Sequence, residues 1–296
     1  MPVQVDVCVC TYRRASLADT LGSIAALQIP AGIKVRVIVA DNDDTPSARV
    51  LVQHTTQALG INCLYVHAPA RNISVARNAC LDAADAPLMA FLDDDETATE
   101  SWLEKLISSQ RSTGATVVFG PIMAIYPPEP AWLRQADLHS IRPAIRKSGE
   151  IDTGYTSNVL IHRAGLSDAS LACRFDPGLG RSGGEDTEFF RRLHELGARL
   201  TFCSDAYVNE IVTPGRANLV WLLKRSFRSG QTYGQLSNGG RRTATAVAAI
   251  GKLVYCLAGA GSRAASPPGW RRLLVRGFLH AGVVANSIGL RNLQLY

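Results

Sequence analysis

Continuous apolar segments alternate with segments of helical periodicity four times in the first 112 residues. The apolar segments are predicted strands and cover residues 3–10, 35–40, 61–67 and 88–92. The periodic segments are predicted helices and cover residues 17–27, 46–59, 74–84 and 99–112. Ser16 and Thr45 are the predicted N-cap residues of the first two helices. Strands without a polar face are typical of parallel sheets covered by helices on both sides, so the alternation predicts an α/β fold with a doubly wound sheet.

Polar residues gather where each predicted strand ends. These clusters cover residues 11–14, 41–44, 71–72 and 93–95. In a doubly wound sheet, ligands bind beyond the edge where the carboxyl ends of the parallel strands meet. One acidic turn can occur anywhere, but four polar clusters at four strand ends indicate a single binding site.

The fourth cluster opens a run of four acidic residues, from Asp93 to Glu96. Their charges repel, so we expect them at the open end of the strand, facing solvent or a cation. Carboxylates two residues apart, such as Asp93 and Asp95, bind a hard divalent ion that also holds phosphate oxygens. The alternative is an acidic turn that caps the helix starting near Thr99. On local sequence alone, both interpretations stay open.

The other clusters suit the remaining parts of a nucleoside diphosphate. Asp41 is placed to accept a hydrogen bond from a base imide or a sugar hydroxyl; alternatively, it caps a helix together with its acidic neighbours. Arg71 and Arg77 flank the start of the third helix, where arginine and the helix dipole both favour a pyrophosphate. Arg77 and Asn78 equally suit a polar helix face. With the cation, the set describes a nucleoside-diphosphate donor.

A second acidic centre, Glu185-Asp186, follows the glycine-rich residues 178–184 and opens a helix. A carboxylate at a helix start is stabilised as the anion, which suits a general base that deprotonates an acceptor hydroxyl. The alternative is ordinary helix capping.

The sequence lacks the motifs of several other classes of enzyme and metal site. The sequence has no Gly-x-Ser-x-Gly elbow, no Walker A loop and no Gly-x-Gly-x-x-Gly after the first strand, which disfavours hydrolases, P-loop NTPases and dinucleotide enzymes. The seven cysteines form no Cys-x-x-Cys pair and the six histidines no His-x-x-x-His spacing. We therefore expect reduced cytosolic thiols and no zinc site.

Charge is divided unevenly along the chain. Residues 211–296 contain 12 Lys and Arg and no Asp or Glu, which leaves 19 basic against 25 acidic residues in the first 210. A wholly basic tail suggests an anionic partner: a membrane, a lipid phosphate or a nucleic acid. The tail lacks the regular aromatic interleaving of nucleic-acid binders, so no nucleic-acid partner is predicted.

Two apolar segments in this tail, residues 244–260 and 273–290, are predicted helices. Charged or small residues interrupt both, and we predict that they lie in a membrane surface and do not span it. The basic residues around them are Arg241, Arg242, Arg263, Arg271 and Arg272. The alternatives are a helical subdomain packed on the sheet, or a dimer contact.

Five motifs occur in the order found in one known family. They read Cys-Thr-Tyr-Arg-Arg, Val-Ala-Asp-Asn, Arg-Asn-Ile-Ser-Val-Ala-Arg-Asn, Phe-Leu-Asp-Asp-Asp and Gly-Gly-Glu-Asp-Thr-Glu-Phe. In this the chain resembles glycosyltransferase family 2, the inverting enzymes of GT-A fold, over about residues 3–230. The Gly-Gly-Glu-Asp form, with Glu210 and Arg216, is most similar to bacterial exopolysaccharide glucosyltransferases of the succinoglycan type.

The resemblance implies a role for each matching residue. Thr11 and Asp41 would contact uridine, Arg77 and Arg71 would approach the diphosphate, and Asp186 would be the catalytic base beside Glu185. Asp93 and Asp95 would bind Mn²⁺ or Mg²⁺, with Asp95 as the more direct ligand. The remaining residues implied in nucleotide-sugar binding are Tyr12, Arg14 and Asp94.

The implied reaction transfers a sugar, expected to be glucose, from a UDP-sugar to a hydroxyl of a saccharide acceptor, expected to be polyprenyl-diphosphate-linked. Residues 1–215 would form the catalytic domain and residues 216–296 a basic helical extension on the cytoplasmic side of the inner membrane. The Gln-x-x-Arg-Trp motif of processive synthases is missing, so we expect single additions. Two alternatives remain: a sugar-1-phosphate nucleotidyltransferase, although no glycine-rich loop follows the first strand, and an inactive sugar-nucleotide-binding scaffold subunit.

Overall fold

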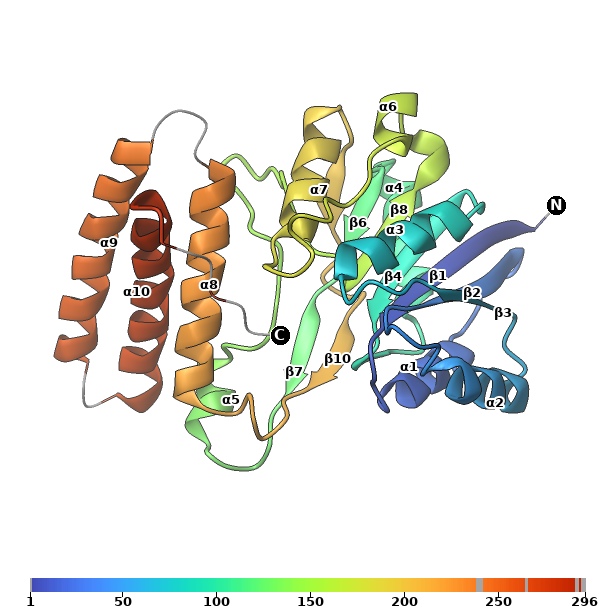
Figure 1. Cartoon of the computed structure of the whole chain (residues 1–296), viewed down its shortest axis with the longest axis horizontal. Coiled ribbons are helices and arrows are strands. Elements are labelled where there is room, and N and C mark those ends of the chain that lie inside the picture. Colours follow the sequence, from blue (N-terminus) through green and yellow to red (C-terminus); the bar gives the residue numbers. More distant parts are fainter. Residues whose placement is uncertain (1, 238–241, 264–265, 291–292, 294–296) are drawn as a thin grey trace. The chain divides into compact units, whose positions relative to one another are not determined.

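A computed structural model describes residues 2–237, 242–263, 266–290 and 293 (Figure 1). The chain forms two compact units, each built from several segments. The first unit comprises Met1–Met123, Ser140–Arg181 and Glu185–Glu210, and the second Ala124–His139, Ser182–Gly184 and Ile211–Tyr296. Two short segments from the first 210 residues thus group with the C-terminal helices. The predicted division into a catalytic domain, residues 1–215, and a basic helical extension, residues 216–296, stays a prediction.

A seven-stranded sheet in the order β3-β2-β1-β4-β8-β6-β9 forms the centre of the first unit. Its strands are β1 (Val3–Thr11), β2 (Ile33–Asp41), β3 (Cys63–His67), β4 (Leu88–Asp93), β6 (Val117–Phe119), β8 (Asn158–His162) and β9 (Leu200–Phe202). All neighbouring pairs are parallel except those of β8, which runs antiparallel to β4 and β6. The predicted doubly wound, mostly parallel sheet is confirmed.

Helices cover both faces of this sheet (Figure 1). They are α1 (Leu17–Ala25), α2 (Arg49–Leu59), α3 (Ile73–Ala83), α4 (Trp102–Thr113), α6 (Asp168–Leu171) and α7 (Glu185–Glu195). Along β1, Val5, Val7 and Val9 join the core beneath α1 and α4, whereas Cys8 and Cys10 join the core beneath α3 and α7. This alternation follows from the two-residue period of a strand and explains why β1 has no polar face. All seven cysteines are free thiols, as predicted.

Several predicted boundaries were wrong, each for a local reason. Helix α2 begins at Arg49, because Asp41 Oδ2 accepts a hydrogen bond from the N–H of Ala48 (2.8 Å) and Thr45 stays in the preceding loop. Ser16 precedes α1 but makes no side-chain capping bond.

A short strand that the sequence did not predict, β5 (Glu96–Ala98), follows the acidic run. It lies at the edge of a second sheet of order β5-β10-β7, with β10 (Val208–Ile211) and β7 (Ile122–Ile125). Glu96 is only 2% exposed in this strand. The expectation that all four acids face solvent or a cation was therefore wrong for Glu96.

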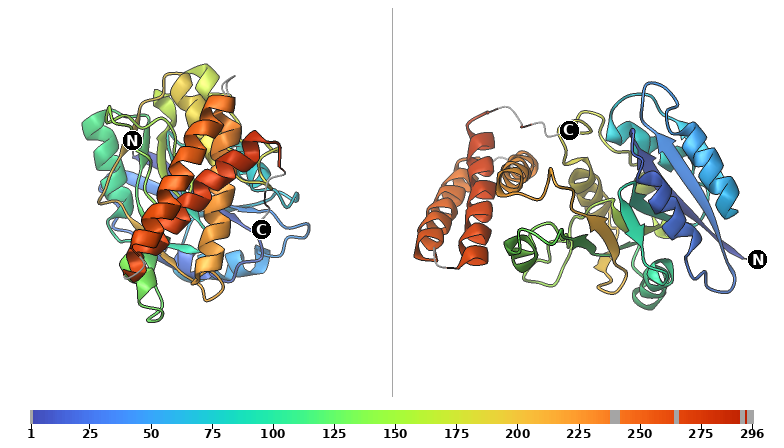
Figure 2. Two further views of the ribbon diagram at one scale, coloured as in Figure 1. Left: turned by 90° about the vertical axis from the view of Figure 1, so that its left-hand side faces the viewer. Right: turned by 90° about the horizontal axis from the view of Figure 1, so that it is seen from below.

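The second unit consists mainly of helices α5 (Trp132–Ala136), α8 (Leu219–Ser237), α9 (Arg242–Ser262) and α10 (Pro267–Ser287). Helix α10 packs against both α8 and α9 (Figure 2). Glycines allow α8 and α10 to approach closely: a Cβ on Gly230 would lie 1.9 Å from the carbonyl oxygen of Leu279. Of the predicted basic residues, Arg241 lies outside the described residues.

Among the described helices, one segment, Thr243–Ser262 of α9, is long and apolar enough to cross a membrane, judged by length and composition only. The segment contains one charged residue, Lys252, and the expectation that it lies in a membrane surface without spanning it stays a prediction. Only 11% of its most apolar window is buried in the unit.

Candidate active site

The carboxyl ends of β1, β2 and β4 bring the predicted polar clusters to one edge of the sheet. Thr11 is in register with Asp41 on β2, and Cys10, the residue before it, is in register with Asp93 on β4. The parallel pairing thus places side chains from three separate motifs side by side, as expected for a doubly wound sheet.

The three aspartates that end β4 have different partners. Asp94 accepts a hydrogen bond at Oδ2 from Thr11 Oγ1 (2.7 Å). Arg14 Nη1 lies 3.3 Å from Asp95 Oδ2, and both side chains are partly exposed. Within the described residues, the carboxylate of Asp93 takes part in no hydrogen bond or ion pair. Thr11, predicted to contact uridine, is buried and positions Asp94 instead.

Burial and mutual repulsion disfavour the ionised form of these acids. Burial raises the pKa of Asp93 to about 7; the charge of Arg77 opposes this, and the charges of Asp95, Asp94 and Glu210 reinforce it. Burial likewise raises the pKa of Asp94 to about 6, against the hydrogen bond from Thr11. Burial raises the pKa of Glu96 well above its ordinary value, and Glu210 faces Glu96 across the β5–β10 pair.

This turn suits a hard divalent cation. Its donors are carboxylate oxygens, and the carboxylate of Asp93 has no hydrogen-bond or ion-pair partner among the described residues. An added cation would compensate the repulsion between these carboxylates. The described residues contain no group of three or more His, Cys, Asp or Glu side chains placed to hold a metal. An ion at Asp93 and Asp95 would therefore take its other ligands from phosphates and water, which is how Mg²⁺ is commonly held at phosphate sites.

A cavity of about 450 Å³ opens beside this turn, at the ends of β1 and β2. Its size falls in the range of small-ligand pockets. It is lined by Arg13, Arg14, Ala15, Asp43, Thr45, Ser47, Ala48 and Leu51. Arg13 Nε donates a 2.8 Å hydrogen bond to Asp43 and lowers the pKa of that carboxyl to about 2. Tyr12, 38% exposed, lies beneath the guanidinium of Arg13, 5.4 Å from the ring centroid.

Asp41, predicted to contact the nucleoside, is fully buried and does not line this cavity. Its carboxylate accepts hydrogen bonds from the N–H groups of Asp43 (3.1 Å) and Ala48 (2.8 Å) and from the hydroxyl of Tyr65 (2.6 Å). This geometry favours the capping alternative: Asp41 shapes the loop that forms one wall of the cavity. Asp43, Thr45 and Ser47 are the polar residues of that loop that reach the cavity.

The two arginines predicted at the diphosphate differ in their surroundings. Arg71 is half exposed and pairs with Asp44. Arg77 is 6% exposed, and its Nη1 lies 2.5 Å from Oε1 of Glu185, which is equally buried. The second oxygen of Glu185, Oε2, is buried without a partner. Arg77 thus joins α3 to the start of α7.

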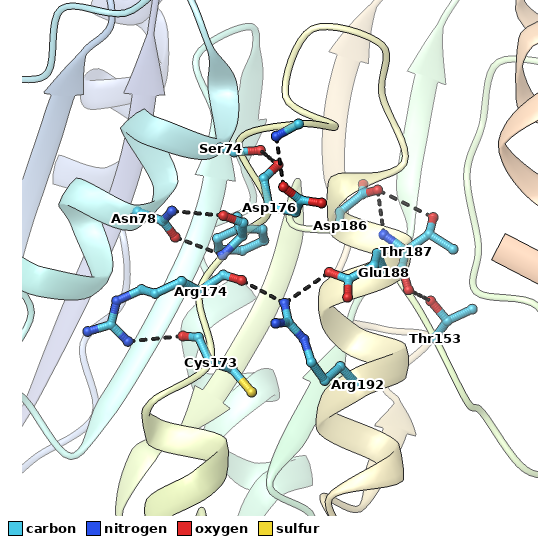
Figure 3. Close-up of polar contacts among 12 residues, drawn as sticks. Ser74, Asn78, Thr153, Cys173, Arg174, Asp176, Asp186, Thr187, Glu188 and Arg192 are labelled. Atoms are coloured by element: carbon cyan, nitrogen blue, oxygen red, sulfur yellow. Dashed lines mark hydrogen bonds and ion pairs between the residues drawn. The ribbon is translucent and has the colours of Figure 1, made fainter. Parts of the chain in front are cut away.

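Asp186 stands in the first turn of α7 (Figure 3). Its Oδ1 accepts hydrogen bonds from the N–H of Thr187 (2.7 Å) and from Thr187 Oγ1 (3.3 Å), which fixes the carboxylate. Burial and the charge of Glu185 raise its pKa to about 6, against the charge of Arg77. Such a carboxylate is ionised near neutral pH yet basic enough to accept a proton.

An irregular segment, residues 173–178, fastens α7 to α3 (Figure 3). Asn78 on α3 bonds both backbone groups of Phe175, and Ser74 Oγ donates to the carbonyl of Asp176 (2.8 Å). From α7, Arg192 Nη2 donates to the carbonyl of Arg174 (2.6 Å). These residues fix where α7 begins, and the only sequence signal for them was the polar face around Asn78.

The three residues before Glu185 belong to the second unit. Arg228 on α8 donates from Nε to the carbonyl of Ser182 (2.8 Å). Gly183 and Gly184 have φ angles of 84° and 96°, and a Cβ on Gly183 would lie 2.0 Å from Arg228 Nη2. The positive φ therefore favours glycine at Gly183, and a Cβ there would displace the guanidinium of Arg228.

Comparison with known proteins agrees with this architecture. The profile of the family described as Glycosyl transferase family 2 matches residues 6–168, more than half of the chain. The chain belongs to glycosyltransferase family 2. One relative, the succinoglycan biosynthesis protein ExoM of Rhizobium meliloti, is 45% identical over 99% of this chain and 96% of its own length. Another relative, the glucosyl-dolichyl phosphate glucuronosyltransferase of Haloferax volcanii, is 26% identical over 77% of this chain and 75% of its own length.

Solved structures place this family-2 chain in the GT-A fold. The mannosyltransferase PcManGT of Pyrobaculum calidifontis, solved with GDP-Man and Mn²⁺, superposes with a TM-score of 0.67 at 18% identity, over 97% of this chain and 87% of that one. S. aureus TarS residues 1–349 with UDP superposes with a TM-score of 0.55 at 15% identity, over 97% and 92%. The resemblance to family 2 and its GT-A fold is therefore confirmed.

Proposed function

We propose that this family-2 enzyme transfers a single sugar, glucose, from a UDP-sugar to a hydroxyl of a saccharide acceptor in bacterial exopolysaccharide synthesis, with inversion at the anomeric carbon. The observation that carries the proposal is Asp186, a fixed carboxylate of raised pKa beside Glu185, whose partner Arg77 also interacts electrostatically with Asp93 at the end of β4. The near full-length identity to a succinoglycan biosynthesis protein supports the polysaccharide assignment.

The donor is assigned to the cavity and the acidic turn. The cavity loop, with Asp43, Thr45 and Ser47, would take the nucleoside, and exposed Tyr12 would contribute a stacking surface. Arg14, half exposed at the rim, is better placed than buried Arg77 to reach a diphosphate. Asp94, which accepts a hydrogen bond from Thr11, and Arg71, which pairs with Asp44, would then help to form the walls of the donor site.

The chemistry divides between the two acidic centres. Oδ2 of Asp186 takes the proton of the acceptor hydroxyl, whose oxygen bonds to the anomeric carbon as the bond to the diphosphate breaks. Displacement from the opposite side converts an α-linked donor into a β-linked product. A divalent cation, Mn²⁺ or Mg²⁺, held by Asp93 and Asp95 would supply Lewis-acid stabilisation of the departing diphosphate.

The proposed acceptor is linked to a polyprenyl diphosphate at the cytoplasmic face of the inner membrane. Two observations support it: the relative from Haloferax volcanii is named for a lipid-linked glucosyl substrate, and residues 211–296 carry no acidic side chain. An anionic lipid phosphate is compatible with such a basic region.

The testing experiment incubates the protein with a panel of sugar nucleotides and measures UDP release, with and without Mn²⁺ and with candidate lipid-linked acceptors. UDP release from one UDP-sugar that requires the metal and rises with the acceptor is expected. Release of pyrophosphate from a nucleoside triphosphate and a sugar phosphate would instead identify a nucleotidyltransferase. Binding of a sugar nucleotide without any turnover would identify a scaffold subunit.

A further inference from the structure

Helix α9 carries an apolar stripe that the described residues of its unit leave exposed. Val247, Ile250, Val254 and Leu257 are 69%, 47%, 60% and 47% exposed, and their spacing of three and four residues places them on one helix face. Tyr255 beside them is 71% exposed. Single exposed apolar side chains are normal, but a contiguous patch of this kind marks an interaction surface.

The opposite face of α9 is occupied. Ala249 and Cys256 are 4% and 1% exposed, and a Cβ on Gly277 of α10 would lie 3.4 Å from the Cβ of Cys256. Helix α9 is thus held against α10 by one face (Figure 2). The side chains of the stripe lie on another face and are exposed.

Charge identifies the occupant of the stripe. Residues 211–296 carry 12 basic and no acidic side chains, and two of the basic residues, Lys252 on α9 and Arg263 just beyond it, are exposed. A second copy of this chain would bring the same basic helices face to face. An anionic lipid surface is instead complementary to both the apolar stripe and the surrounding charge.

We propose that α9 lies in the surface of an anionic bilayer, with the stripe from Val247 to Leu257 in the acyl boundary and Lys252 at the level of the headgroups. Lys252 is two residues from both Ile250 and Val254, which places it on the other side of the helix from the stripe, so it stays at the headgroup level while α9 lies parallel to the surface. In a spanning arrangement Lys252 would lie near the middle of the hydrocarbon layer, which is unfavourable for a charged side chain. Only the purpose of this membrane contact rests on the proposed function: it would bring the enzyme to a lipid-linked acceptor.

The experiment is flotation of the full-length protein with vesicles of phosphatidylcholine containing phosphatidylglycerol, and with phosphatidylcholine alone. At low salt we expect flotation with the anionic vesicles, weaker flotation with the neutral ones, and release by high salt or alkaline carbonate. Val254→Asp should lower the bound fraction roughly tenfold by placing a charge in the acyl boundary. Lys252→Gln should lower it less.

The matched control is Val50→Asp on α2, a valine of similar exposure (63%) in the first unit, which should float like the wild type. Circular dichroism and UDP release show whether each variant is folded, and because flotation needs no donor or acceptor, its failure is distinguishable from failure of the proposed reaction. Wild-type protein that stays at the bottom with anionic vesicles, or Val254→Asp that floats normally, overturns the proposal. Resistance to carbonate would show a spanning helix, and a dimer that Val254→Asp dissociates would show a contact between copies; either result also overturns it.

Discussion

The two acidic centres of the first unit, the β4 turn and the start of α7, both contain buried carboxylates. They differ in whether a cation of the protein is paired with them. In both, burial raises the pKa of an aspartate, to about 7 for Asp93 and about 6 for Asp186. At α7 a buried cation, Arg77, pairs directly with the neighbouring Glu185. Asp93 has no such partner within the described residues. The centre with an internal cation suits a proton acceptor, and the centre without one suits an added metal ion.

The strongest test of this division is Asp186→Asn. Because the amide cannot accept the acceptor proton, we expect the transfer rate to fall by about 10²–10⁴-fold while UDP affinity stays within about twofold. Transfer is measured with saturating donor and acceptor, and UDP affinity by calorimetry. Glu195→Gln, at the exposed end of the same helix, is the control and should transfer normally. Wild-type transfer by Asp186→Asn would make that residue a helix cap only.

The second largest expected effect is a loss of stability when the buried cation, Arg77, is removed. Arg77→Met leaves Glu185 buried without its partner, which typically costs about 3–5 kcal/mol in the free energy of unfolding. The double variant Arg77→Met/Glu185→Leu should recover most of that loss, because no charge is left uncompensated. Urea unfolding of both variants measures the difference. Equal stability of the single variant and the wild type would show that the pair is not structurally important.

Removing a carboxylate from the β4 turn should affect the metal-dependent part of donor binding. We expect Asp95→Ala to weaken UDP binding in Mn²⁺ by roughly 10- to 100-fold and to leave binding in chelator unchanged, because phosphate and metal share the site. Calorimetry in both conditions measures this, with Asp19→Ala on the surface of α1 as the control. If the wild type binds UDP equally well in Mn²⁺ and in chelator, the turn holds no functional metal.

The smallest expected effect is a difference between the two centres in the pH dependence of transfer. As the proposed base, Asp186 would act in its ionised form. Since its pKa is raised to about 6, transfer should rise as the pH rises through that value and fall about tenfold per unit below it. Asp93, with a pKa of about 7 in the absence of metal, must also ionise to bind a cation. At saturating Mn²⁺ the limb near pH 6 should therefore remain, whereas at low Mn²⁺ a second limb near pH 7 should appear. A single limb that moves with the metal concentration would assign both effects to Asp93.

The sequence predicted the sheet and its edge well, because those depend on local periodicity. The period of two along β1 and the helical stripes determine which faces are buried, so the α/β order followed directly. It predicted individual partners poorly, because these come from distant parts of the chain. Thr11 and Asp94 are 83 residues apart, and Arg77 and Glu185 are 108 apart. No local pattern shows that Thr11 donates a hydrogen bond to Asp94, or that Arg77 pairs with Glu185 at the start of α7.

Asp41 and Glu96 illustrate the same limit. Each stands in an acidic run whose members look equivalent in sequence. The structure turns Asp41 inward to the N–H of Ala48 and the hydroxyl of Tyr65, and places Glu96 in a strand opposite Glu210. Which carboxylate of a run faces the cavity depends on the loop that follows it, and that loop is set by contacts with other strands.

The bond from Arg228 to the carbonyl of Ser182 has a practical consequence for anyone who shortens this chain. Ending the protein near residue 215, the obvious way to remove the basic helices, also deletes the anchor of the tripeptide that immediately precedes Glu185 and Asp186. A truncated enzyme that loses activity would therefore say nothing about lipid, because the loop before the proposed base would have lost its support. Point substitutions on the exposed stripe of α9 leave Arg228 in place, so they separate attachment to a surface from support of the loop before Glu185.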